Sequence, residues 1–179
     1  MPIRKLLPTD AGEYFRLRLE GLQSFPEAFG ESAEEFEALD LQAVAERIAT
    51  RSHQTACILG HFDEDEVLRG TVGLQGSSRQ KMQHTALLWG FYVARESRGQ
   101  GLGQKLVETL LSEARSWQGL EQIKLSVSSR NEGAMRLYRS FGFETFGVEP
   151  RALKLGDEYF DEDHMMLWLG RGFGAGETG

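Results

Sequence analysis

A glycine-rich stretch in the middle of the chain has the residue types and spacing of an anion-binding turn. It reads Arg98-Gly-Gln-Gly-Leu-Gly103. The aromatic, apolar run 85–93 before it is typical of a buried strand, and 102–117 after it has the periodicity of an amphipathic helix. A helix start offers unpaired N–H groups, and glycines let successive N–H groups point at one phosphate. The spacing predicts a phosphate cradle, with Arg98 adding a full charge at its rim.

Two common phosphate-binding motifs do not fit this stretch. A P-loop requires G-x-x-x-x-G-K-[ST], and no Lys-Ser or Lys-Thr pair follows these glycines. The dinucleotide fingerprint G-x-G-x-x-G, counted from Gly99 and Gly101, ends at Gln104. The spacing alone leaves another kind of cradle or a plain glycine-rich turn.

A second group of residues lies further along the chain. Asn131 can cap a helix in which Ala134, Leu137 and Tyr138 share one face, and Gly142 can close that helix. Between the two groups, the pattern predicts one helix and one strand, over about 122–127. A strand, a helix and a further strand form a right-handed parallel crossover.

Both segments resemble motifs of the GCN5-related N-acetyltransferase (GNAT) superfamily, in bacterial members of unassigned substrate. The first pattern is Arg/Gln-x-x-Gly-x-Gly/Ala, and the second is Asn-x-x-Ala-x-x-x-Tyr-x-x-x-Gly-Phe. The positions that match them in order are Arg98, Gly101 and Gly103, followed by Asn131, Ala134, Tyr138, Gly142 and Phe143. The interval between the motifs also agrees with the family.

The resemblance implies an α+β fold with a central mixed antiparallel and parallel sheet. The sheet would have six to seven strands, splayed between strands four and five, and about four flanking helices. Acetyl-CoA would be the cosubstrate, with its pantetheine arm between the splayed strands. The implied cofactor-binding residues are Phe91, Tyr92 and Val93 on strand four, then Arg98, Gly99, Gln100, Gly101, Leu102 and Gly103 at the pyrophosphate, and Asn131 near the sulfur.

Acetyl transfer to an amine needs a neutral amine, donors for the carbonyl oxygen and a proton for the departing thiolate. By the resemblance, Tyr138 would protonate the thiolate; the alternative is an ordinary core tyrosine. No base is evident, because 85–93 contains no carboxylate and no histidine. Water could relay the proton to a distant carboxylate, or the substrate could arrive partly neutral. Four acidic residues precede the final strand, which is expected at 164–169: Glu158, Asp161, Glu162 and Asp163. They could attract an ammonium group or simply form a solvated loop.

The remaining pattern predicts the elements around these motifs. Strands are expected at 3–7, 55–62, 67–75 and 143–148, and helices at 10–23 and after Asp40. The strand pair joined by an acidic hairpin turn at 63–66, followed by 85–93, suggests an antiparallel meander. Phe25 and Phe29 lie in a Pro/Gly loop and are either loop anchors or the lip of a pocket. His84 and His164 are interpreted as structural, and no metal-ligand spacing is present.

Composition bounds the class of protein. The 179 residues carry a net charge of -7, which argues against a general nucleic-acid surface and suits cationic substrates. No apolar run is long enough for a membrane span. The single cysteine, Cys57, is interpreted as a buried core residue, and a lone cysteine agrees with a cytoplasmic protein. We expect one acetyltransferase domain over 1–169, a flexible Gly-rich tail over 170–179, and a monomer or homodimer.

The sequence therefore predicts an acetyl-CoA-dependent N-acetyltransferase. Its acceptor would be a primary amine of a small cationic molecule, attacking directly in a ternary complex. Two alternatives stay open: acetylation of protein N-termini or lysines, and a non-catalytic module that senses acyl-CoA.

Overall fold

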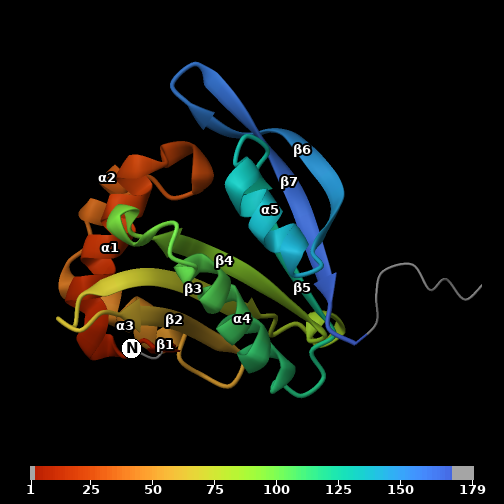
Figure 1. The fold of residues 1–179 in the computed structure, drawn as a ribbon, viewed down its shortest axis with the longest axis horizontal. Coiled ribbons are helices and arrows are strands. Elements are labelled where there is room, and N and C mark those ends of the chain that lie inside the picture. The colour runs from red at the N-terminus through yellow and green to blue at the C-terminus, as the bar shows by residue number, and fades with distance from the viewer. Residues whose placement is uncertain (1–2, 171–179) are drawn as a thin grey trace, which may run out of the picture.

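The computed structural model describes residues 3–170 (Figure 1). Seven strands form one sheet in the order β1-β2-β3-β4-β5-β7-β6, with all neighbours antiparallel except β4 and β5. This confirms the expected mixed sheet and the meander of β2 to β4. The strands are β1 (Ile3–Lys5), β2 (Ala56–Phe62), β3 (Leu68–Gly76), β4 (Thr85–Val93), β5 (Gln122–Ser128), β6 (Glu144–Leu155) and β7 (Glu158–Trp168).

Helices cover both faces of the sheet, and each face has its own apolar core. The described α-helices are α1 (Ala11–Ser24), α2 (Ala33–Glu37), α3 (Leu41–Thr50), α4 (Leu102–Arg115) and α5 (Glu132–Ser140). On one face α4 and α5 bury Leu106, Leu110 and Tyr138, while α1 to α3 bury Leu17 and Ile48 on the other. Asp40 caps α3 as predicted, its Oδ1 accepting from the Ala43 N–H at 2.8 Å.

The sheet opens between its fourth and fifth strands. β4 and β5 are paired only over Thr85–Leu87 and Gln122–Lys124, although both strands continue well beyond these residues. Figure 1 shows β4 and β5 diverging, with α4 in front and α5 beside β5 and β7. The parallel crossover and the splay are thus confirmed, and the backbone groups that face the gap lack a neighbouring strand.

One extra residue in β4 distorts the strand beside this opening. Thr71 pairs with Tyr92 and Gly73 with Trp89, so three steps along β4 oppose two along β3. Gly90 takes a left-handed backbone conformation there, with φ of 61°. The Thr71 hydroxyl donates to the Gly90 carbonyl at 3.2 Å and holds this bulge in place.

The last two strands are longer than predicted, which corrects the expected ranges 143–148 and 164–169. The acidic segment 158–163 belongs to β7, where it pairs with β6 and, at Glu162 and Asp163, also with β5. His164 lies in the middle of the strand rather than at its start. Charged residues have poor strand propensity, but pairing with β6, and with β5 at the end of the segment, overrides it. The expected tail beyond Gly170 lies outside the described residues.

Candidate active site

A cavity of about 620 Å³ lies where the sheet opens. Its walls come from β4, β5 and α5, from the glycine-rich turn, and from the loop that carries Phe25 and Phe29. Both phenylalanines line it, and the Phe25 ring also packs edge-on against Tyr92, so they serve as pocket lip and loop anchor together. Most of the residues proposed from the sequence meet here: Phe91, Tyr92, Val93, Arg98, Gly99, Gly101, Leu102, Gly103, Asn131 and Tyr138.

The glycine-rich turn presents unpaired donors to this cavity. Within residues 3–170, the backbone N–H groups of 99–104 have no hydrogen-bond acceptor, and the first α4 bond at this end runs from Lys105 N to Gly101 O. Gly99 and Gly101 have φ values of 73° and 77°, which residues with a side chain rarely adopt. Free donors at a helix start form an anion-binding arrangement.

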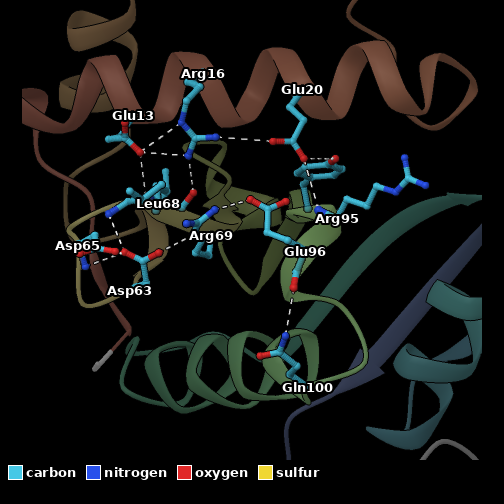
Figure 2. A network of polar contacts seen from close by, with 12 residues as sticks. Glu13, Arg16, Glu20, Asp63, Asp65, Leu68, Arg69, Arg95, Glu96 and Gln100 are labelled. Atoms are coloured by element: carbon cyan, nitrogen blue, oxygen red, sulfur yellow. Dashed lines mark hydrogen bonds and ion pairs between the residues drawn. The ribbon is translucent and has the colours of Figure 1, made fainter.

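Gln100 is the one proposed residue of the turn that does not line the cavity. Its side chain folds back and donates from Nε2 to the Glu96 carbonyl at 3.1 Å (Figure 2). The side chain thus braces the turn, and only the backbone N–H of Gln100 could bind a ligand in the cavity.

Arg98 is exposed and lines the cavity, and its side chain is also held by neighbouring groups. Its Nε donates to the Val93 carbonyl at 3.0 Å and its Nη2 donates to the Tyr92 hydroxyl at 3.0 Å. The guanidinium also lies 5.0 Å from the centre of the Phe25 ring. Arg98 therefore ties the turn to the end of β4 and to the phenylalanine loop.

A polar network continues from this point to α1 and β3 (Figure 2). The Tyr92 hydroxyl donates to Glu20 at 2.9 Å, and Glu20 lies 3.6 Å from Arg16. On the opposite side of the turn, Arg69 donates to Asp63 at 2.6 Å and forms an ion pair with Glu96. Because these contacts hold residues 94–98 to α1, β3 and β4, the segment that leads into the glycines is positioned by distant parts of the chain.

The end of β4 turns backbone groups toward the opening. Ala94 N–H donates to the Arg69 carbonyl on the β3 side at 2.8 Å. Successive residues of a strand alternate in direction, so the N–H and C=O of Val93 face away from β3. Its carbonyl accepts the bond from Arg98.

α5 contributes the two remaining predicted residues. The Asn131 Oδ1 accepts from Ala134 N–H at 3.0 Å, which caps α5, while its amide nitrogen has no hydrogen-bond partner within residues 3–170. Tyr138 is only 4% exposed and packs edge-on between Phe91 and Phe143. Burial raises the pKa of its hydroxyl far above the ordinary value, so the group is a neutral proton donor at physiological pH.

The acidic residues of β7 are mostly committed to structural contacts. Asp163 is buried and accepts from the hydroxyls of Ser129 at 2.7 Å and Thr145 at 3.1 Å. Asp161 accepts from Arg151 N–H and Glu158 pairs with Arg130. Glu162 differs, because burial raises the pKa of its carboxyl.

Sequence reasoning missed two hydroxyls in the cavity wall. Ser126 and Ser128 line the β5 side, and the Ser128 Oγ is buried without a hydrogen-bond partner within the described residues. No motif marks either serine, although their alternation with the buried Leu125 and Val127 indicates a second face of the strand.

Two further features bear on function. In the part of the chain that the structure describes, no group of three or more His, Cys, Asp or Glu side chains could hold a metal ion, and no helix is long and apolar enough to cross a membrane. Burial raises the pKa of the Cys57 thiol to about 11, which agrees with its interpretation as buried filler.

Comparisons with known proteins agree with the motifs. A methionine sulfoximine and methionine sulfone acetyltransferase of Pseudomonas paraeruginosa is 35% identical over 78 residues, 44% of this chain and 45% of its own. An L-amino acid N-acetyltransferase of Escherichia coli is 28% identical over 67% of this chain and 72% of its own. This chain thus spans less than half the length of the Pseudomonas relative it matches.

Among solved structures, a phosphinothricin acetyltransferase of Sinorhizobium meliloti in complex with acetyl-CoA has the same fold. Its TM-score is 0.81 at 18% identity, over 96% of this chain and 90% of that one. The family model for the acetyltransferase (GNAT) family matches residues 19–143, more than half of the chain. The chain therefore belongs to the acetyltransferase (GNAT) family.

Proposed function

We propose that this protein is an N-acetyltransferase that moves the acetyl group of acetyl-CoA to a primary amine of a small molecule. The observation that carries the proposal is one cavity that contains both the unpaired N–H groups of 99–104 and the hydroxyl-bearing side chain of Tyr138. A pyrophosphate at the N–H groups of 99–104 and a thioester near Tyr138 would account for the extent of the cavity along the open sheet.

The backbone would do most of the cofactor binding. The N–H groups of 99–103 would take the pyrophosphate, while Arg98, whose own N–H donates to the Arg95 carbonyl at 3.4 Å, would hold the turn in shape. Backbone groups of Phe91 and Val93 would pair with the amides of the pantetheine arm, as an added strand does. Tyr92 would support β4 through its side chain, and the free amide nitrogen of Asn131 would bind near the sulfur.

Direct attack in a ternary complex would need three groups. A backbone N–H at the β4 bulge would stabilise the oxyanion, since donors placed before the reaction cost little reorganisation. Tyr138 would give its proton to the departing thiolate, which the raised pKa of its buried hydroxyl permits over the whole physiological range. The amine would enter at the mouth between Phe25, Phe29 and Ser126.

Our preferred acceptor is a small cationic amine. Glu162 pairs with Ser128 of the cavity wall on β5, and Glu149 pairs with Glu162 on the other side; these two carboxyls would attract an ammonium group. The named activities of the Pseudomonas and Escherichia coli relatives concern amino acids and their analogues, which also carry a primary amine. We further propose one catalytic domain over 1–169, a cytoplasmic location, a monomer or homodimer, and no nucleic-acid or membrane partner.

Thermal melting with and without acetyl-CoA tests the cofactor first. A ligand that binds only the folded state stabilises it, by about 2.7 kcal/mol at a concentration 100 times the Kd. Thiol release from acetyl-CoA is then followed with polyamines, amino acids and short peptides. A rise in Tm together with release for one amine class supports the proposal. A rise without release for any amine would indicate an acyl-CoA sensor, and no rise would reject the cofactor assignment.

A further inference from the structure

The proposed reaction leaves one proton without an acceptor. An amine that attacks a thioester becomes an ammonium, which must lose a proton, yet β4 has no carboxylate and no histidine. A base must therefore come from another wall of the cavity. The following inference rests on the proposed function.

Three side chains on adjacent strands form a hydrogen-bonded line. Ser126 on β5 lies opposite His164 on β7, and its Oγ is 2.8 Å from His164 Nδ1. The other ring nitrogen, Nε2, is 3.0 Å from Oε2 of Glu149 on β6. An ionised carboxylate can only accept, so Nε2 carries the hydrogen and Nδ1 is free to accept from the serine hydroxyl.

Only Ser126 of the three reaches the cavity, and it does so at the level where β4 is distorted. The β4–β5 register, continued from Leu87 and Lys124, brings Ser126 level with Trp89, one residue before the bulge at Gly90. Leu125 and Val127 enter the core with α4 and α5, so Ser126 faces the other side of the sheet. Phe25 and Phe29 reach the same cavity from the loop after α1.

The surroundings of His164 hold the ring in place. The Phe146 ring lies 6.1 Å from it, tilted by 30°, and the histidine side chain is 30% exposed. Glu162, on the same strand, interacts electrostatically with both His164 and Glu149.

We propose that Ser126, His164 and Glu149 form the relay that removes the proton from the acceptor amine. As nitrogen attacks the thioester carbon and the carbon–sulfur bond breaks, the amine proton passes to Ser126 Oγ. The serine hydrogen passes to His164 Nδ1, which gives an imidazolium paired with Glu149, while Tyr138 protonates the thiolate. Solvent then removes the proton from His164 and returns one to Tyr138. Glu149 acts through the imidazole and is a positioning residue.

The test measures turnover and cofactor binding in Ser126→Ala, His164→Gln and the double variant, with the amine that gives the fastest thiol release in wild type. Each single variant should lower kcat by about 100-fold. The double variant should be no slower than either single one, because the two groups act as one unit. The acetyl-CoA-dependent rise in Tm should stay as in wild type, and Glu149→Gln should have a smaller effect. Ser112→Ala and His53→Gln, at exposed positions away from the cavity, are the matched controls.

Three results would overturn the relay. Unchanged kcat in both single variants, with an active wild type, rejects it and leaves the proposed function intact. Multiplicative losses in the double variant would mean independent roles. A stable acetyl adduct on wild type with acetyl-CoA alone, absent from Ser126→Ala by intact mass, would make Ser126 a nucleophile instead. If the wild-type protein releases no thiol with any amine, both the proposed function and the relay are rejected.

Discussion

The two ends of the cavity are built in different ways. The glycine end consists of a short contiguous segment whose backbone N–H groups face the opening, with side chains such as Arg98 serving as braces. The mouth consists of side chains from β5 and the phenylalanine loop, which are distant along the chain, and Ser126 at the mouth is bonded to His164 on β7, which in turn contacts Glu149 on β6. A backbone site keeps its chemistry under most substitutions, whereas a side-chain site can change its acceptor by a few. This difference suits a common cofactor and a variable acceptor.

The largest expected effect comes from blocking the backbone end. Gly101→Glu would place a carboxylate among the unpaired N–H groups, and we expect acetyl-CoA affinity to fall by at least about 100-fold, close to 3 kcal/mol. Loss of the cofactor-dependent rise in Tm measures it.

The matched control for that variant is Gly119→Glu. Gly119 has φ of 79° and open space around an added Cβ, as Gly101 does, but it does not line the cavity. Both variants should lose about 1–2 kcal/mol of stability through left-handed strain. Equal cofactor affinity in the two variants would remove the glycine turn from the site.

Tyr138→Phe tests the boundary between the two ends. We expect kcat to fall by about 100-fold with acetyl-CoA affinity retained, because only the proton for the thiolate is removed. In the wild-type protein, burial keeps the Tyr138 hydroxyl protonated. Ionisation of Tyr138 should therefore not lower turnover at any pH below about 10, the ordinary pKa of tyrosine. Tyr14→Phe, at a buried tyrosine outside the cavity, is the control. Unchanged turnover would assign Tyr138 to packing alone.

A smaller effect should follow from loosening the brace of the turn. Arg98→Lys keeps the charge but loses the planar fork that reaches Val93 and Tyr92 together, so we expect acetyl-CoA to bind about tenfold more weakly. Arg95→Lys, at an exposed side chain outside the cavity, should bind as wild type does. If charge alone mattered at Arg98, the two variants would behave alike.

The smallest effect on catalysis should come from the buried hydrogen bonds of Asp163, which support the strands next to the mouth. Asp163→Ala leaves the hydroxyls of Ser129 and Thr145 without their acceptor, and should cost about 1–3 kcal/mol of the free energy of unfolding. The KM for the amine should rise a few-fold with acetyl-CoA affinity unchanged. Glu158→Ala, at an exposed ion pair, should change stability by less than about 1 kcal/mol. A drop in cofactor affinity for Asp163→Ala would mean that the two ends are coupled.

The sequence was most informative where a function occupies one continuous segment. The strand at 85–93, the glycine turn and the capped helix after Asn131 could be predicted because periodicity and capping are local properties. The extent of β7 could not, because its acidic residues are poor strand formers and only pairing with β6, and with β5 from Glu162 onward, fixes them in the strand.

Local order therefore determined the meander, the crossover and the glycine turn, whose backbone geometry depends on glycine placement and helix starts. The tertiary structure alone decided that Arg98 bonds to the end of β4, that Gln100 folds back, and that Ser126, His164 and Glu149 form a line. The contacts of His164 with Ser126 and Glu149 join residues that are 38 and 15 positions apart along the chain, and sheet register sets their distances. Register depends on the packing of every strand at once, which no short stretch of sequence encodes.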